Sequence, residues 1–354
     1  MISVSESTKK TQVSVILLNY NEKAFLNKCL SSLQQQTYRS FNVILVDNAS
    51  TDGSVSYVKK EFPWVTLVEN RENVGFSAGC NSGVKFSDAD YIVFLNCDTM
   101  VDKKWLEMLI AGVETNRAGI CGAKILDMTN PALIQEVGGL SDQFGFSLSQ
   151  GWGELDKAKY NMSRETFYVS GASLLIKKEV INKIGLFDSA YFFNQEDVDI
   201  CWRAHLAGYK VVVNPLAVVY HKGGGSAQGA PGSNVNNVKG SYVTSAWRRY
   251  YAERNILRTL LKNYQLISLV KLLLPFFVIF FSEIVYYIFS GRLNVAEAYL
   301  KALLWNFQHL KDTLYNRQIV QSIRSVSDRE IRKLMIPGIG KILRFKQIGR
   351  PNYA

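Results

Sequence analysis

The residues best suited to chemistry stand where a run of apolar residues ends. The run Tyr91–Leu95 is mostly of β-forming types, and Asn96, Cys97 and Asp98 follow it directly. This pattern predicts a buried strand that ends in polar side chains. Ligands bind at the carboxyl ends of strands in open α/β sheets, and a carboxylate there can hold a divalent cation against a diphosphate. The alternative is an ordinary strand followed by an Asx turn.

A second group of acids, Glu196, Asp197 and Asp199, stands at the start of a predicted helix. Acids in a first turn interact favourably with the helix dipole, which is a purely structural explanation. It does not account for the aromatic pair Phe192–Phe193 just before them, which is typical of a pocket wall. His221, one of only three histidines, follows a predicted strand. By itself, such a histidine is more often structural than a metal ligand.

The elements that must position these residues alternate between strands and helices. Strands are expected at Val13–Leu18, Phe41–Val46, Val65–Val68, Tyr91–Leu95, Phe167–Ile176, Val211–Val213 and Ala217–Tyr220. Helices are expected after each of the first three. This alternation predicts an α/β fold with a mostly parallel sheet, whose polar strand ends line one edge where a nucleotide could lie.

Three glycines and one long segment complete the pattern. Gly75, Gly79 and Gly83 recur every four residues, which is not the spacing of the dinucleotide fingerprint. They favour one face of a helix that packs closely on the sheet. The segment 119–153 is rich in glycine and has no clear period, so it predicts no particular element.

Charge is distributed unevenly along the 354 residues. Residues 1–254 hold 26 Lys and Arg against 25 Asp and Glu, and residues 255–354 hold 15 against 5. The basic end suits either nucleic acid or an anionic membrane, and its apolar content favours the membrane. Without an aromatic groove, nucleic-acid binding is not expected. Five scattered cysteines indicate reduced thiols, and the polar start of the chain indicates no signal peptide, so we expect the cytoplasm.

The motifs, taken in order, resemble those of the family 2 glycosyltransferases with the GT-A fold, a Rossmann-like sheet with flanking helices. The resemblance is specific because five separate motifs agree with the family pattern: Leu18–Asn21, Val46–Ser54, Asn73–Gly83, Leu95–Thr99 and Glu196–Arg203. The resemblance covers about residues 12–260, and its nearest branch is the bacterial rhamnosyltransferase-like enzymes of cell-surface polysaccharide assembly, such as O-antigen or cell-wall synthesis.

The resemblance implies a nucleotide site at the strand ends. Asp47 would accept a hydrogen bond from the pyrimidine N3–H of the donor nucleotide. Asn19, Asn21, Asn73 and Asn96 stand where the family lines the nucleotide pocket. The implied donor is dTDP-rhamnose or a UDP-sugar, and the implied acceptor is a glycolipid or glycan.

The resemblance also implies a cation, Mg²⁺ or Mn²⁺, and a base. Asp98 matches the metal-binding position of the family's DxD motif, and His221 matches a histidine that completes the metal shell in some relatives. Cys97 departs from the branch and is expected to point away from the metal. Asp197 matches the catalytic base, with Glu196 beside it shaping the acceptor site.

The implied chemistry is coherent on physical grounds. Transfer from a nucleotide-sugar needs a cation to offset charge on the leaving diphosphate and a base to take the proton of the acceptor hydroxyl. A single base opposite the leaving group gives direct displacement with inversion, unlike the two-carboxylate route of retaining glycosidases. Trp247–Arg248 lacks the Gln-x-x-Arg-Trp order of processive synthases, so we expect one or a few additions.

The C-terminal end is expected to associate with a membrane. Leu272–Phe289 is almost wholly apolar but contains Pro275 and Glu283. An acid at the centre of a span costs about 2.5–3.5 kcal/mol on insertion scales. We therefore favour a helix in the membrane interface on the cytoplasmic face of the inner membrane. A full span and an ordinary buried helix or dimer contact are the alternatives.

The domains expected from these patterns are a flexible N-terminus (1–11), a catalytic domain (12–254), a membrane-associating helical region (255–335) and a basic, poorly ordered tail (336–354). The favoured function is a metal-dependent, inverting glycosyltransferase. A sugar nucleotidyltransferase is the enzymatic alternative, although Asn19–Glu22 is not a glycine-rich phosphate loop. A membrane-attached scaffold that binds nucleotide without turnover is the other.

Overall fold

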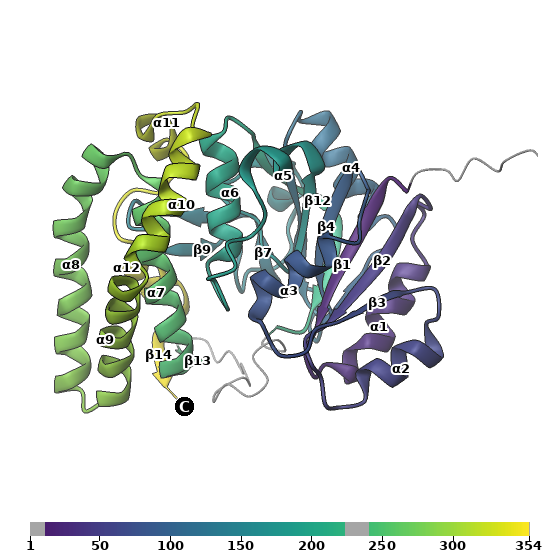
Figure 1. Cartoon of the computed structure of the whole chain (residues 1–354), viewed down its shortest axis with the longest axis horizontal. Helices are drawn as coiled ribbons and strands as arrows, with labels where there is room; N and C mark the ends of the chain where they lie inside the picture. The colour runs from purple at the N-terminus through teal and green to yellow at the C-terminus, as the bar shows by residue number, and fades with distance from the viewer. Residues whose placement is uncertain (1–10, 224–240, 354) are drawn as a thin grey trace, which may run out of the picture.

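The computed structural model describes residues 11–223 and 241–353, which are built around one ten-stranded sheet (Figure 1). The strands lie in the order β10-β12-β6-β11-β4-β1-β2-β3, with β5 paired to β12 and β7 paired to β6. Their bounds are β1 Val13–Asn19, β2 Phe41–Asp47, β3 Thr66–Glu69, β4 Tyr91–Asn96, β5 Thr99–Val101, β6 Ile120–Asp127, β7 Ile134–Val137, β10 Arg164–Glu165, β11 Ser173–Lys177 and β12 Val211–His221.

The half of the sheet formed by β4, β1, β2 and β3 is parallel, as predicted from the alternating elements. Its register aligns the polar strand ends. Asn19 of β1 lies opposite Asp47 of β2, and Leu18 lies opposite Asn96 of β4. Because the three strands run in one direction, their carboxyl ends meet at one edge of the sheet, which is where open α/β sheets bind ligands.

The other half of the sheet departs from the sequence prediction. The strand expected at 167–176 is shorter, β11, and it runs antiparallel to both β4 and β6. The two short strands expected near residues 211–220 form one strand, β12, with an irregularity between Asn214 and Val218. The segment without a clear period contains β6, a fully paired strand buried along almost its whole length. Strands buried on both faces lack alternation, which is why its period was not visible.

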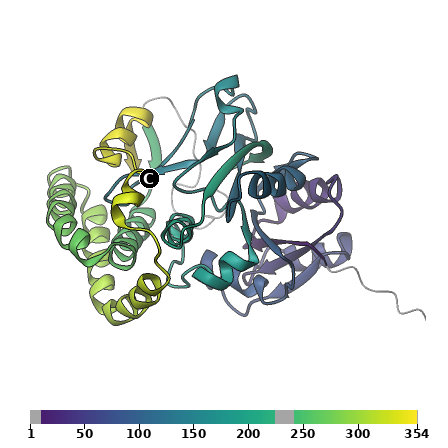
Figure 2. The ribbon, with the colours of Figure 1, turned by 90° about the horizontal axis from the view of Figure 1, so that it is seen from above.

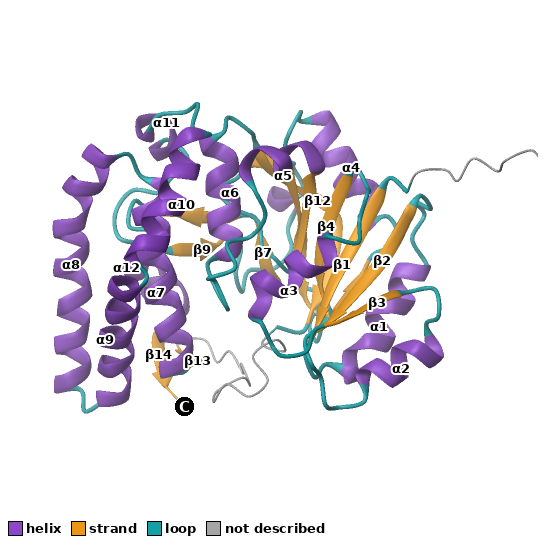
Figure 3. Ribbon diagram, viewed as in Figure 1, coloured by secondary structure: helices purple, strands orange, loops and turns teal. Residues whose placement is uncertain are grey.

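Helices cover both faces of the sheet, and each face has its own apolar core (Figure 3). Helices α1 Lys23–Gln34, α2 Ser54–Glu61 and α4 Trp105–Thr115 contribute to one core. Helices α3 Gly75–Val84, α5 Lys178–Ile184 and α6 Glu196–Leu206 contribute to the other. The close packing expected of the glycine face is confirmed, because a Cβ on Gly79 would lie 2.5 Å from a Leu18 methyl and one on Gly83 would lie 2.7 Å from Ile16.

A layer of helices follows, on the side of the molecule away from α1 and α2 (Figure 2). Its elements are α7 Ala246–Asn263, α8 Leu266–Phe289, α9 Leu293–Gln308, α10 Leu310–Ser322, α11 Asp328–Arg332 and α12 Gly340–Ile348. The expected domain boundary after residue 254 falls inside α7. Buried ion pairs tie α7 to the sheet domain: Arg258 lies 2.9 Å from Asp188, and Lys262 lies 2.6 Å from Asp188 and 3.1 Å from Asp199.

The prediction of a poorly ordered tail from residue 336 is wrong. Residues 340–348 form α12, and β14 Arg350–Tyr353 pairs in parallel with β13 Ser241–Thr244. Lys341 of α12 contacts Glu253 of α7 and Glu283 of α8. The segment was predicted to be unstructured because the acids that pair with its basic residues are distant in the sequence. The remaining small elements are β8 Gly139–Ser141, β9 Ser147–Ser149 and the 3₁₀ turn Ala158–Tyr160.

Among the described residues, α8 is the one helix long and apolar enough to cross a membrane. Only one of its faces is buried against the protein, and that face includes Phe276 and Phe280. The opposite face is exposed: Leu274 is 75% and Phe289 87% accessible. Glu283 turns inward and pairs with Lys341, so the acid that weighed against a span does not face the exposed side.

Candidate active site

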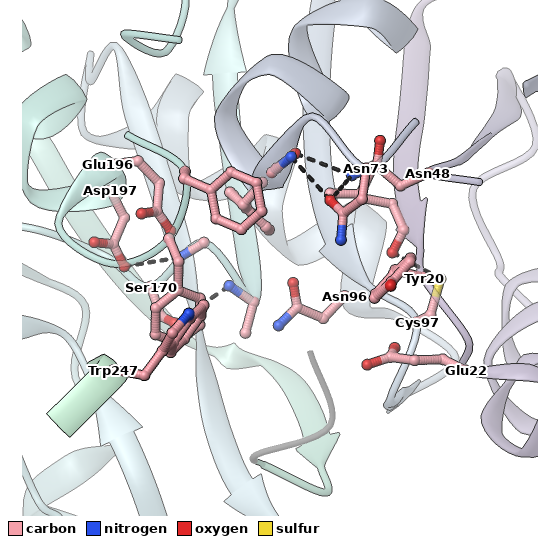
Figure 4. A pocket seen from close by; sticks show the side chains of 17 residues that line it. Tyr20, Glu22, Asn48, Asn73, Asn96, Cys97, Ser170, Glu196, Asp197 and Trp247 are labelled. Carbon is pink, nitrogen blue, oxygen red and sulfur yellow. Dashed lines mark hydrogen bonds between the residues drawn. The ribbon is translucent and has the colours of Figure 1, made fainter. Parts of the chain in front are cut away.

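A cavity of about 150 Å³ opens at the carboxyl edge of the parallel strands (Figure 4). It brings together Asn73, Asn96, Glu196 and Asp197, four of the residues predicted from the sequence. The other lining residues are Leu18, Tyr20, Glu22, Asn48, Gly75, Phe76, Cys97, Ser170, Gly171, Ala172, Phe192, Phe193 and Trp247. Phe192 and Phe193 thus form the pocket wall expected of the aromatic pair.

Asp197 enters the cavity from the first turn of α6 and is partly exposed. Its carboxylate accepts hydrogen bonds from the backbone N–H groups of Gly171 (3.1 Å) and Val198 (2.8 Å). Burial raises the pKa of Asp197, and these two N–H groups oppose that rise because they stabilise the anion. A carboxylate held as an anion with one edge open to a cavity is equipped to accept a proton.

Glu196 differs from its neighbour. It is buried, and burial together with the negative charge of Asp197 raises its pKa to about 8. Its Oε2 has no hydrogen-bond partner among residues 11–223 and 241–353. Two adjacent carboxyls do not ionise together readily, so Glu196, with a pKa of about 8, keeps its proton at neutral pH.

The turn before α6 is held in an unusual backbone conformation. Asn194 and Gln195 both have positive φ angles, 72° and 77°, a backbone conformation that residues other than glycine rarely adopt. Asn255 of α7 secures this turn, because its Nδ2 donates to the carbonyl oxygens of Phe193 (2.9 Å) and Asn194 (2.6 Å). The C-terminal helical layer therefore helps to aim the two acids.

Asp199, the third acid of the group, lies away from the cavity. It is fully buried and pairs with Arg203 (2.9 Å) and Lys262 (3.1 Å). Both of its oxygens accept hydrogen bonds in this network: Oδ2 accepts from Lys262, and Oδ1 accepts from the Asn263 side chain. Asp199 is therefore a structural residue that joins α6 to α7.

The predicted nucleotide residues Asn19, Asn21 and Asp47 do not line this cavity; Asn19 and Asp47 end β1 and β2, and Asn21 follows β1. Asp47 is buried and accepts from the Asn19 side chain (2.7 Å) and from the backbone N–H of Ser50 (2.9 Å). Asn21, with a φ of 57°, accepts from the N–H of Thr51 (2.7 Å). These bonds fix the loop 47–54 against β1.

Asn73 stands in a second polar network on the cavity wall. Its Oδ1 accepts from the Asn48 side chain (3.0 Å) and from the N–H of Gly75 (2.9 Å), where α3 begins. The N–H of Phe76 then donates to the carbonyl oxygen of Phe192 (2.8 Å). This chain of hydrogen bonds connects the side of the cavity that holds Asn48 and Asn73 with the side that holds Phe192 and the acids.

Asp98 and His221 come together as predicted from the metal motif. The Nε2 atom of His221 lies 3.1 Å from Oδ1 of Asp98, and its Nδ1 lies 2.9 Å from Oε1 of Gln135. The Gln135 amide is oriented by its NH₂ group, which donates to Asp127 (3.1 Å) and to the His221 carbonyl (2.9 Å). Its oxygen must then accept from Nδ1–H. Burial lowers the pKa of His221, but the charge of Asp98 and the hydrogen bond to its carboxylate raise that pKa above its usual value, so Nε2–H donates to Oδ1 of Asp98.

These donors fit a divalent cation. An ordered carboxylate and an imidazole with a fixed tautomer are the groups that hold such ions, with diphosphate oxygens and water completing the shell. Burial and then the charges of Asp98 and Asp52 raise the pKa of Glu22 to about 9. The described residues contain no group of three or more His, Cys, Asp or Glu able to hold a metal.

The Cys97 side chain contacts β1. It is fully buried, and its thiol donates to the carbonyl oxygen of Leu18 on β1 (3.3 Å). All five cysteines are buried free thiols, and burial raises the pKa of Cys97 well above its usual value. The thiol is therefore protonated and serves packing.

Several lining residues were missed from the sequence: Tyr20, Glu22, Asn48, Ser170 and Trp247. Tyr20 and Asn48 lie inside motifs that the analysis used and Glu22 directly follows one, so position after a strand end could have found them. Trp247 was noted only for its order relative to an arginine. It comes from the first turn of α7 and packs against Phe193 at a ring distance of 5.0 Å, which no local pattern indicates.

Comparison with known proteins bears on this site. Residues 14–185 match the family model described as Glycosyl transferase family 2. The N-acetylglucosaminyl-diphospho-decaprenol L-rhamnosyltransferase of Mycobacterium tuberculosis is 28% identical over 259 residues, which cover 66% of this chain and 84% of that protein. The poly-beta-1,6-N-acetyl-D-glucosamine synthase of Staphylococcus aureus is 24% identical over 227 residues, 59% of this chain, and the match spans 49% of the synthase.

Two solved structures are similar in fold. A complex of S. aureus TarS residues 1–349 with UDP has a TM-score of 0.52 at 17% identity, with 88% of this chain and 90% of that chain covered. GalNAc-T7 with UDP, GalNAc and Mn²⁺ has a TM-score of 0.54 at 16% identity, with 72% and 48% covered. Together with the family match, they confirm the GT-A fold and the resemblance predicted from the motifs.

Proposed function

Since the chain carries a glycosyltransferase family 2 domain, we propose that it is an inverting enzyme that moves a sugar from a nucleotide diphosphate to a lipid-linked acceptor. L-rhamnose is the proposed sugar and dTDP-rhamnose its donor, with UDP-sugars as the other candidates. One observation carries the proposal: Asp197, whose carboxylate accepts from two backbone N–H groups, faces the cavity into which Asn96 also projects from the strand leading to Asp98.

The proposed chemistry follows from the two acids. Asp197 accepts the proton of the acceptor hydroxyl as that oxygen attacks the anomeric carbon of the donor. Glu196 keeps its proton and bounds the acceptor position. Because the described cavity offers one charged carboxylate on this side, a direct displacement with inversion is favoured over a covalent glycosyl intermediate.

Asp98 and His221 would hold Mg²⁺ or Mn²⁺, and a cation there supplies charge that offsets the developing charge of the leaving diphosphate. The two residues meet on adjacent elements, since His221 ends β12 beside Thr99 of β5. Support comes from the 3.1 Å approach of carboxylate and imidazole. GalNAc-T7, similar in fold, is described with Mn²⁺ in its own structure.

The nucleotide would lie along Asn19, Asn21, Asp47, Asn73 and Asn96. Asp47 already accepts two hydrogen bonds, but a carboxylate has about four acceptor positions and can take one more from a pyrimidine N3–H. The chain's own residues Asn19 and Ser50 orient the Asp47 carboxylate.

The proposed acceptor and location rest on the C-terminal helices. The relative from M. tuberculosis is named for an acceptor with a diphospho-decaprenol group. Here, the exposed apolar face of α8 and the excess of 15 basic over 5 acidic residues after 254 support binding to the cytoplasmic face of a membrane. In this proposal 12–254 is the catalytic region and 255–335 the membrane-associating region, with α7 shared between them.

The test is transfer by purified protein in detergent. A panel of dTDP-, UDP- and GDP-sugars is offered with Mg²⁺ or Mn²⁺, and nucleotide release is measured together with the anomeric configuration of the product. The proposal expects release of one nucleotide with an inverted product. Retention of configuration, or release of inorganic diphosphate as a nucleotidyltransferase would give, would refute it.

A further inference from the structure

A buried acid that the proposed chemistry does not use lies next to the turn that precedes β11. This acid is Glu136 of β7, which is 7% exposed. Its Oε2 accepts hydrogen bonds from the hydroxyls of Ser149 (2.7 Å) and Tyr168 (3.3 Å), and its Oε1 accepts from the backbone N–H of Ser170 (3.0 Å). Burial of a carboxyl group costs free energy, and burial raises the pKa of Glu136 to about 7. An apolar side chain would avoid this cost, so the acid is expected to do more than fill space.

The turn formed by residues 170–172 connects this acid with the candidate base. The N–H of Ser170 donates to Glu136, and the N–H of the next residue, Gly171, donates to Oδ2 of Asp197 (3.1 Å). Figure 4 shows Asp197 pointing toward the turn beside Ser170. Successive N–H groups of one short turn therefore bind two acids from distant parts of the chain, one on β7 and one on α6.

The same turn forms part of the wall of the active-site cavity. Ser170, Gly171 and Ala172 all line that cavity. Ser170 also lines a separate cavity of about 230 Å³, together with Glu136 and Ser149. A segment that borders two cavities has fewer packing contacts to hold it in place. Its position therefore depends more strongly on hydrogen bonds such as the one to Glu136.

The turn is also bonded to the strand that leads to the cation site. The carbonyl oxygen of Ala172 accepts from the backbone N–H of Asn96, the last residue of β4 (3.2 Å). A displacement of the turn would thus be felt on both sides of the cavity, at Asn96 and at Asp197.

Loss of the Glu136 carboxyl would remove the acceptor of the Ser170 N–H. The turn would then be free to move, and with it the Gly171 N–H, which is one of the two backbone donors that hold the Asp197 carboxylate; the other is Val198. A misplacement of about 1 Å at a reacting group can cost about 10²-fold in rate.

We propose that Glu136 is a positioning residue, which holds the turn 170–172 and through it the carboxylate of Asp197. The inference rests on the proposed function, in which Asp197 is the base. Glu136 does not line the active-site cavity, so it acts through the turn and not by contact with the substrates.

The test compares three variants of the full chain in detergent. Glu136→Ala removes the acceptor, whereas Glu136→Gln keeps an oxygen that can accept from the Ser170 N–H. Asp328→Ala is the matched control, because Asp328 is also a buried acid that accepts from a backbone N–H, that of Gln265 (2.9 Å), but it lies on α11 and does not line the cavity. The measurements are kcat and KM for transfer, affinity for dTDP and UDP by calorimetry, the melting temperature, and deuterium exchange of residues 168–173.

We expect Glu136→Ala to lower kcat about 10–100-fold, while KM for the donor and the nucleotide affinity change less than about twofold. Deuterium exchange at residues 168–173 should become at least about tenfold faster, because the turn opens more often. Glu136→Gln should restore kcat and exchange to within about threefold of wild type, since it restores the hydrogen bond. Asp328→Ala should lower the melting temperature and leave kcat unchanged.

An unchanged kcat or an unchanged exchange rate in Glu136→Ala would overturn the inference. So would a Glu136→Gln variant as impaired as Glu136→Ala, or an equal fall of kcat in Asp328→Ala. If Glu136→Ala does not fold, Ser149→Ala with Tyr168→Phe removes the two hydroxyls that orient the carboxyl, and kcat should fall about three- to tenfold; no fall would overturn the inference. Deuterium exchange needs no turnover, so a wild type that transfers no sugar would reject the proposed function while exchange at residues 168–173 still tests the role of Glu136.

Discussion

Asp197→Asn is the substitution that most directly tests the assignment of the base. The amide keeps the size and position of the carboxylate, and its oxygen can still accept from the N–H of Gly171 or Val198, but it cannot take a proton. A positioned general base contributes about 10²–10⁴-fold, so kcat should fall by that factor, or about 3–5 kcal/mol in the barrier.

The assay separates chemistry from binding. Transfer is measured at saturating donor, and the affinity for the nucleotide is measured by calorimetry. Since Asp197 lies across the cavity from the strand ends of β1 and β2, nucleotide affinity should change less than about twofold. Glu253→Gln serves as a control for general damage, because it makes the same acid-to-amide change at a buried position of α7 that does not line this cavity.

Transfer by Asp197→Asn at the wild-type rate would refute the reasoning. Asp199 could not then replace it, because that carboxylate is fully buried and paired with Arg203 and Lys262. The base would have to be sought among the other cavity residues, of which Glu22 and Glu196 are the remaining acids.

Three further predictions concern pH, packing and the membrane. The pKa of Glu196 rises on folding from 4.5 to about 8, so the folded state holds the proton and its contribution to stability falls as pH rises between those values. Glu196→Gln should make the melting temperature depend less on pH over that range. An unchanged dependence on pH would contradict the raised pKa of Glu196. Gly79→Ala would place a methyl 2.5 Å from a leucine of β1 and should cost about 1–3 kcal/mol in urea unfolding, whereas a neutral result would show that α3 can shift. Replacing Leu274 and Val278 by Gln should weaken binding to phosphatidylglycerol vesicles at least tenfold in sedimentation assays. Leu216→Gln, at an exposed leucine of β12, should have no effect, and equal loss in both would remove α8 from the interface.

The parallel half of the fold was predictable from the sequence because its signals are local. Strand, polar end and helix follow one another within about thirty residues, and the register of β1, β2 and β4 aligns Asn19, Asp47 and Asn96 as the pattern required. The antiparallel direction of β11 was not predictable in this way. It depends on β6, whose apolar run gives no period that distinguishes strand from helix.

The candidate site was partly predictable for the same reason. Asn73, Asn96, Glu196 and Asp197 stand at the ends of elements, so their types and positions indicate a role. Contacts across long sequence distances were not visible. Trp247 reaches the cavity from α7, and Gln135 fixes His221 from β7 across 86 residues.

The fate of the C-terminal segment shows the same limit. Its charge predicted a disordered tail, but Lys341 finds two buried acids, Glu253 and Glu283, on helices that precede it by 88 and 58 residues. A run of like charges indicates solvent exposure only when no oppositely charged side chain from another part of the chain pairs with it. The apolar run Leu272–Phe289 predicted a helix, and the structure has a helix there, α8. The structure adds which face of α8 is covered by the protein.

Nucleotide release by the purified full chain, with and without divalent cation, in wild type and Asp98→Ala, tests the central claim most directly. The account predicts release of one nucleotide from a single class of donor, dependent on Mg²⁺ or Mn²⁺ and lost in Asp98→Ala, while the melting temperature shows that the variant is folded. Release that persists in EDTA, or at an unchanged rate in folded Asp98→Ala, would contradict the assignment of Asp98 and His221 as the cation site.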